Sequence, residues 1–158
     1  MTTLNRISGL HHCAYRCRNA EETRSFYEDL LNLPLAHVIQ ADSVPSTGAT
    51  DPYVHLFFEY ADGSYIAFFD LGDETSCIPD PETPSWVNHF AMQVKTVAEV
   101  EEWKTRLEAA GIEVVGMTDH EFVKSIYFFD PNGIRLEITC EVIGESDRYR
   151  TGSGFDIT

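Results

Sequence analysis

The sequence has no excess of positive charge and no long apolar run. Its 11 lysine and arginine residues are outnumbered by 26 aspartate and glutamate residues, which gives a formal net charge of −15. Nucleic acids and anionic membrane surfaces attract basic proteins, so this balance argues against both as partners. No stretch approaches the roughly 18 to 20 apolar residues of a membrane helix. The N-terminal residues "MTTLNRISGLHH" also lack the apolar core of a signal peptide.

The four cysteines form no CxxC motif and no dense framework. Reduced thiols in a cytoplasmic protein are therefore the expectation. The apolar fraction of 43% and the aromatic fraction of 12% are typical of a globular chain rather than a disordered one. A chain of 158 residues is long enough for one domain, or for two small modules fused together.

Two segments of the chain are weakly similar to each other. Aligning "LHHCAYRCRNAEETRSFYEDLLNLPL" (10–35) with "NHFAMQVKTVAEVEEWKTRLEAAGI" (88–112) places His12 on His89. Each segment reads as a strand followed by a helix, and "NAEE" and "TVAE" are suited to cap the two helices. A hairpin follows each helix, with turns at "ADG" and "DPNG". The repeat predicts two βαβββ modules.

The expected architecture is thus an α+β fold in a single domain over 1–158. The first module covers 8–70 and the second covers 85–142. A linker rich in proline and acidic residues joins them over 71–84. The last segment, 143–158, is polar and is expected to pack poorly.

The alternation of residues in "YFFDPNGIRLEIT" (127–139) separates a core face from a polar face. Residues two apart in a strand share a face, so Leu136 and Ile138 point to the core and Glu137 points away from it. The same alternation sends His12 and His89 away from the helices. If the modules pair through their repeat symmetry, the two imidazoles and the carboxylate converge. Such a set with open coordination positions favours Fe(II), and Mn, Zn or Ni can also use it.

The segments "GLHHCAYRCRNAEETRSFYEDLLNLPL" and "YFFDPNGIRLEIT" resemble the vicinal oxygen chelate superfamily. This group includes glyoxalase I, extradiol dioxygenases, and fosfomycin and bleomycin resistance proteins. The resemblance covers about residues 8–142 and implies paired modules that form a cupped, incomplete barrel around one metal ion. The spacing to Phe26 makes His12, rather than His11, the counterpart of the family's ligand. Members of this length commonly form homodimers.

The number of carboxylate ligands distinguishes branches of this superfamily. Aligning the hairpins on Gly63 and Gly133 places Ala67 opposite Glu137, whereas glyoxalase I has a carboxylate in both modules. Alanine cannot bind a metal, so His12, His89 and Glu137 remain as three ligands, as in the extradiol dioxygenases and the fosfomycin resistance enzymes. We therefore favour an Fe(II) extradiol-type dioxygenase that acts on a small aromatic diol or a related vicinal-oxygen substrate.

Two further residues are candidates for catalysis. Tyr127 stands where extradiol and fosfomycin resistance enzymes carry an active-site tyrosine. His120, next to Asp119 in an expected loop, offers acid–base chemistry. His55 is expected to be structural.

Two alternatives stay open. A glyoxalase- or epimerase-like lyase or isomerase would use a divalent metal as a Lewis acid. A binding protein that sequesters a small molecule is the third hypothesis, and the intact ligand set argues against it. The chain also departs from the enzymes it resembles. It lacks the lysine that fosfomycin enzymes use for phosphonate, and Ser64 replaces the outer histidine of typical extradiol enzymes.

Overall fold

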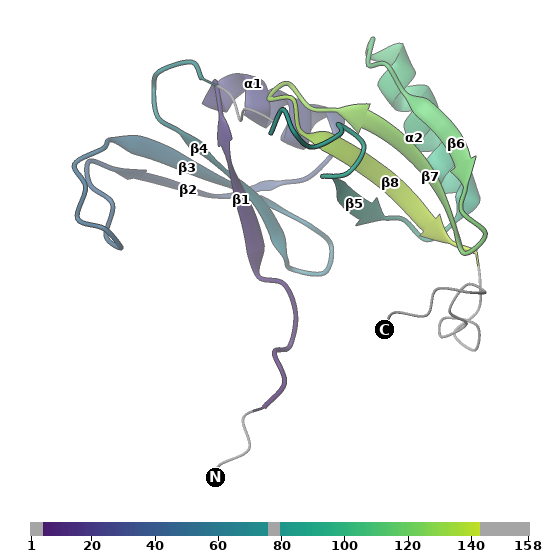
Figure 1. The fold of residues 1–158 in the computed structure, drawn as a ribbon, viewed down its shortest axis with the longest axis horizontal. Helices are drawn as coiled ribbons and strands as arrows, with labels where there is room; N and C mark the ends of the chain where they lie inside the picture. The colour runs from purple at the N-terminus through teal and green to yellow at the C-terminus, as the bar shows by residue number, and fades with distance from the viewer. Residues whose placement is uncertain (1–4, 76–79, 143–158) are drawn as a thin grey trace. The chain divides into compact units, whose positions relative to one another are not determined.

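The protein is described here by a computed structural model that covers residues 5–75 and 80–142. The chain forms two compact units (Figure 1). The first consists of Met1–Pro79 together with Pro131–Gly133, and the second of Asp80–Asp130 together with Ile134–Thr158. None of the helices in the described ranges combines the length and the apolar character that a membrane crossing requires.

The first unit contains a four-stranded sheet and one helical segment. Its strands are arranged in the order β1-β4-β3-β2, with β1 parallel to β4 and the other pairs antiparallel. The elements in chain order are β1 (His12–Cys17), α1 (Ala20–Arg24), the π-helix η1 (Ser25–Leu30), β2 (Leu35–Ala41), β3 (Tyr53–Glu59) and β4 (Tyr65–Asp70).

The helical segment starts at a cap that the sequence predicts. The Asn19 side chain accepts a hydrogen bond from the backbone N–H of Glu22 at 2.8 Å. Tyr27, fully buried, then packs on the sheet, with its ring 5.3 Å from that of Phe58 and 4.8 Å from that of Phe68. This packing covers one face of the sheet and leaves the face of His12, Phe57 and Ala67 on the other side.

The second unit repeats the same topology with one longer helix. Its strand order is β5-β8-β7-β6, again with the first pair parallel. The elements are β5 (Phe90–Gln93), α2 (Val97–Ala109), β6 (Val115–Asp119), β7 (Val123–Phe129) and β8 (Arg135–Glu141). The two βαβββ modules predicted from the sequence are confirmed.

Local signals around α2, β7 and β8 behave as predicted. Thr96 and Glu99 form a capping box at the start of α2, and Gly111 follows the helix with a φ of +81°. The turn between β7 and β8 closes where the backbone N–H of Asp130 donates to Ile134 O at 2.9 Å, and Gly133 has a φ of +83°. Leu136 and Ile138 are buried, as their alternation indicates.

Strand register relates the two units position by position. In the first unit Ala67 pairs with Ala14 on one side and with Phe57 on the other. In the second unit Glu137 pairs with Ala91 and with Tyr127. Ala67 and Glu137 are therefore equivalent, as the alignment on the turn glycines predicts, and Phe57 is the counterpart of Tyr127.

One expectation agrees with the structure and others stay untested. His120 lies in the short turn between β6, which ends at Asp119, and β7. The pairing of the two modules into a cup, and the single-domain boundaries, stay predictions. The predicted tail 143–158 and Cys77 lie outside the described residues. Cys13, Cys17 and Cys140 are free thiols.

Candidate metal centre

His89 and Glu137 form a close pair in the second unit. His89 directly precedes β5, and Glu137 lies in the middle of β8, which pairs with β5. The distance from His89 Nε2 to Glu137 Oε2 is 3.0 Å. Glu137 is only 6% exposed, so its carboxylate has lost most of its water. A buried carboxylate is stable only with a positive partner or hydrogen-bond donors.

The second nitrogen of His89 indicates what that partner can be. His89 Nδ1 lies 3.0 Å from the carbonyl oxygen of Val87, so Nδ1 carries the hydrogen and donates it to this oxygen. Nε2 then either bears a second proton or presents a lone pair to Glu137. A lone pair facing a carboxylate requires a cation between them. The pair therefore holds a proton or a metal ion, but not both.

The separation of the two donor atoms fits a metal ion. Neighbouring ligands of an octahedral ion that sit about 2.1 Å from it are about 3.0 Å apart. The hydrogen bond to Val87 O is the kind of outer contact that orients histidine ligands of metals. An imidazole and a carboxylate are also donors that Fe(II), Mn, Zn and Ni accept. On these grounds the residues present fit a divalent metal.

The third predicted ligand, His12, belongs to the first unit. It is the first residue of β1, is exposed, and its Nδ1 lies 2.8 Å from Nδ1 of His11. Over residues 5–75 and 80–142, no group of three or more His, Cys, Asp or Glu residues is placed to hold a metal. The convergence of His12 with His89 and Glu137 thus stays a prediction.

Tyr127 and His120, predicted from different signals, contact each other. His120 Nε2 lies 2.8 Å from Tyr127 Oη. Tyr127 also faces Glu137 across the β7–β8 pair, and its ring centroid lies 6.0 Å from that of His89. The structure therefore brings four of the five predicted site residues together in one unit.

The surroundings of Tyr127 keep its hydroxyl protonated. Burial is the first cause that raises the pKa of Tyr127, and the negative charge of Glu137 raises it further. The guanidinium of Arg135, which lies 4.4 Å from the centre of the Tyr127 ring, acts in the opposite direction. Tyr127 is thus a hydrogen-bond donor beside the Glu137 carboxylate.

Sequence reasoning missed a polar atom in the first unit. His55, on β3, is 8% exposed and stacks on Phe69 with ring centroids 3.6 Å apart. Its Nε2 has no hydrogen-bond partner among the described residues. Burial first, and then nearby His12, lower the pKa of His55 to about 4. The alternation of side chains along β3 could have indicated this position, because His55 shares a face of the sheet with Phe57, the counterpart of Tyr127.

The chain belongs to the Glyoxalase/Bleomycin resistance protein/Dioxygenase superfamily, whose family model matches residues 9–138. Solved structures share the fold. The genomically encoded fosfomycin resistance protein FosX from Listeria monocytogenes, complexed with Mn(II) and sulfate, is 24% identical, with a TM-score of 0.62 over 87% of this chain and 96% of that one.

Two further structures show the same fold at similar or lower identity. A glyoxalase/dioxygenase from Nostoc punctiforme is 22% identical, with a TM-score of 0.61 over 88% of this chain and 99% of that one. A glyoxylase/bleomycin resistance protein/dioxygenase domain from Frankia sp. is 17% identical, with a TM-score of 0.68 over 86% of this chain and 99% of that one. The superfamily and the fold class predicted from the sequence are confirmed.

Proposed function

We propose that this protein is a metal-dependent enzyme that holds one divalent ion with His12, His89 and Glu137. The observation that carries the proposal is the buried Glu137 carboxylate, 3.0 Å from a histidine nitrogen whose ring partner is already hydrogen-bonded. This arrangement needs a cation, and a metal ion supplies one without the proton that would otherwise occupy Nε2.

The number of ligands supports an extradiol-type dioxygenase that uses Fe(II) on a small aromatic diol or a related vicinal-oxygen substrate. Ala67 occupies the position equivalent to Glu137, and its methyl group cannot bind a metal. Three protein ligands leave room for both oxygens of a diol and for O2. When bound, Fe(II) would supply the redox chemistry that this reaction requires.

Tyr127 and His120 would then carry out the proton transfers of the reaction. Tyr127 is protonated at rest and can donate a hydrogen bond to a substrate oxygen near Glu137. His120 Nε2 lies 2.8 Å from Tyr127 Oη, so Tyr127 can pass its proton to His120 while its oxygen takes the proton of a substrate hydroxyl. Because His120 is exposed, it can pass the proton to water.

A lyase or isomerase that uses Mn, Zn or Ni as a Lewis acid is the second candidate. The same His120–Tyr127 pair supports it, because such reactions move a proton next to a polarised carbonyl. The FosX structures with Mn(II) make manganese a reasonable choice. A phosphonate substrate has less support. Arg16 already forms an ion pair with Asp73, and the chain carries a net charge of −15.

The deciding experiment is purification without oxygen, followed by loading with Fe(II). Bound metal is counted, and oxygen uptake is then measured with a panel of catechols. We expect about one iron per chain, loss of that iron in His12→Ala, and oxygen uptake with at least one catechol. Metal content far below one per chain, and unchanged in His12→Ala, would refute an enzyme of either kind.

A matched set of metals separates the two enzymes. Protein loaded with Zn(II), which has no redox chemistry, cannot carry out the oxygen chemistry of the Fe(II) protein, but it retains Lewis acidity. Stoichiometric iron with no oxygen consumption across the panel would therefore favour the lyase or isomerase. We also retain the homodimer as a prediction, which sedimentation analysis of the metal-loaded protein tests.

A further inference from the structure

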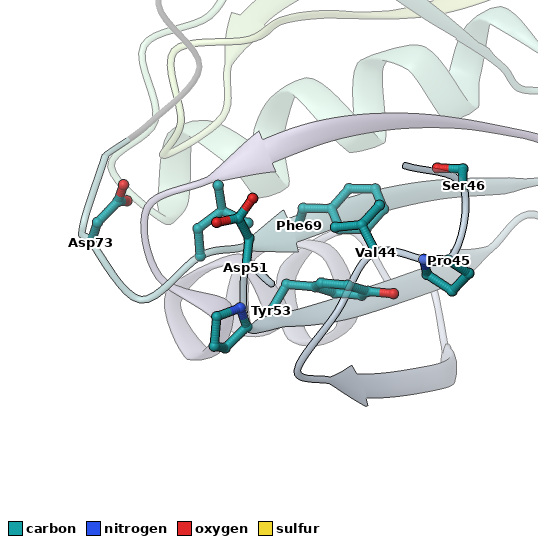
Figure 2. Close-up of a pocket in the computed structure, with 9 residues that line it drawn as sticks. Val44, Pro45, Ser46, Asp51, Tyr53, Phe69 and Asp73 are labelled. Atoms are coloured by element: carbon teal, nitrogen blue, oxygen red, sulfur yellow. The ribbon is translucent and has the colours of Figure 1, made fainter. Parts of the chain in front are cut away.

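The first unit contains a pocket of about 570 Å³ beside the loop that joins β2 to β3 (Figure 2). Val44 and Pro45 of this loop form part of its wall, and Tyr53 and Phe69 contribute the two aromatic side chains of its lining. The volume lies in the range of pockets that bind small organic molecules. All residues that line the pocket come from positions 44–73, so it does not depend on the second unit.

The two rings of the pocket stand edge to face. The centroids of Tyr53 and Phe69 are 5.3 Å apart, with an angle of 70° between the ring planes. Rings at such an angle form two walls of a corner, where an apolar group or an ammonium group can lie against a π face. The pocket is therefore suited to a ligand with a ring or a cationic end.

The charge in the pocket is negative. The lining includes two carboxylates, Asp51 and Asp73, and no lysine or arginine among the described residues. Asp73 is already compensated, because it forms an ion pair with Arg16 and accepts a hydrogen bond from the backbone N–H of Thr75 at 3.1 Å. Asp51 is exposed and has no ion pair or hydrogen bond in the part of the chain that the structure describes. One uncompensated carboxylate thus lies beside two aromatic rings.

A row of rings connects this pocket to the predicted metal ligand of the same unit. Phe69 stacks on His55 with centroids 3.6 Å apart, and His55 lies 6.4 Å from His12. Phe57 completes the row, 4.1 Å from His55 and 5.5 Å from His12. A molecule that reaches along this face would have one end at His12 and its other end in the pocket.

We propose that the pocket binds the end of the substrate remote from the metal, and that this end is a small group carrying an ammonium. The Tyr53 and Phe69 faces and the Asp51 carboxylate recognise the cation together, whereas a phosphonate or carboxylate is repelled. Together with the proposed function, on which this part rests, the substrate class becomes an aromatic diol with a cationic arm.

The test uses three probes that share a phenyl ring but differ in charge. Phenethylamine is cationic, 2-phenylethanol is neutral and 3-phenylpropionate is anionic. Binding to the full chain without metal is followed by calorimetry or by NMR. We expect the amine to bind most tightly and the carboxylate most weakly. Asp51→Asn should weaken the amine about two- to fivefold and leave the alcohol nearly unchanged.

Two further variants make the test decisive. Asp42→Asn removes the same charge from the same loop, but Asp42 does not line the pocket, so amine binding should not change. Val44→Trp fills the pocket and should abolish binding of both amine and alcohol. Equal binding of the amine and the carboxylate would overturn the proposal, as would equal losses in the two aspartate variants. The metal content is measured separately, so a chain that binds the amine but no metal would refute only the proposed function.

Discussion

Replacing Glu137 with glutamine tests the proposed metal centre at the predicted ligand that is most buried. The substitution keeps the size of the side chain and one carbonyl oxygen, but it removes the negative charge 3.0 Å from His89. Loss of a group that merely orients a ligand lowers metal affinity by about 10- to 100-fold. A direct ligand contributes more, so we expect a loss of at least about 100-fold. At 1.4 kcal/mol for each factor of ten, this is about 2.8 kcal/mol.

The same substitution should leave the fold intact. A glutamine amide can donate to His89 Nε2, so the buried polar atoms keep a partner in the metal-free protein. We expect its free energy of unfolding to change by less than about 1 kcal/mol. Metal affinity is measured by competition with a chromophoric chelator under anaerobic conditions, and stability is measured by urea denaturation.

A control variant removes the effect of net charge. Glu113 is exposed, so Glu113→Gln lowers the charge of the chain equally without touching the pair. It should bind Fe(II) like the wild type. If Glu137→Gln retained an affinity within about threefold of the wild type, Glu137 would not be a ligand. The three-ligand centre would then have to be abandoned.

Four other substitutions test the surroundings. Tyr127→Phe should reduce turnover by about 10²- to 10⁴-fold at unchanged metal affinity, because it removes the hydroxyl that contacts His120. Steady-state kinetics measures the turnover, and chelator competition measures the metal affinity. The pKa of His55 falls from 6.5 to about 4 on folding, so the folded protein holds fewer protons and stability should decrease as the pH falls from 6.5 to about 4. His55→Phe should lose this dependence in urea denaturation and gain about 1–3 kcal/mol at neutral pH, since it removes an unpaired buried nitrogen. Ala67→Glu should destabilise the metal-free protein by about 2–4 kcal/mol, because Ala67 is fully buried, whereas Ala14→Glu, on its exposed neighbour, should cost less than about 0.5 kcal/mol.

Local patterns in the sequence were enough to predict most of the fold. The capping box at Thr96 and Glu99, and the turn at Gly133, depend on contacts between residues a few positions apart. The alternation around Glu137 depends only on the period of a strand. Such features are visible in a single sequence because the interactions that produce them are local.

Features that depend on several strands were not visible in the sequence. The hydrogen bond between His120 and Tyr127 exists because β6 and β7 are joined by a short turn, and the start of β6 gave no clear signal. The pocket at Tyr53 and Phe69 requires the loop after β2 to fold over two strands. In the sequence, Tyr53 and Phe69 look like ordinary aromatic residues of two strands. Only the pairing register of β3 and β4 brings their rings together.

The strand register also shows how the two repeated units differ at equivalent positions. The positions of Glu137 and Tyr127 in the second unit are those of Ala67 and Phe57 in the first. One step along the same face, Ser125 hydrogen-bonds to Thr139 at 2.9 Å. The equivalent positions in the first unit hold the stacked rings of His55 and Phe69.

These two polar pairs of the second unit are thus replaced by an apolar pair and an aromatic pair in the first. A duplicated sheet with two carboxylates would supply a fourth metal ligand, and it would leave less apolar surface for the rest of a ligand. With Ala67 in place of a carboxylate, the first unit would contribute a ligand to the proposed metal site only through His12, and the rest of this face would be left to bind the organic part of the substrate. The asymmetry at this one position therefore links the open coordination site of the proposed dioxygenase to the aromatic pocket proposed for its substrate.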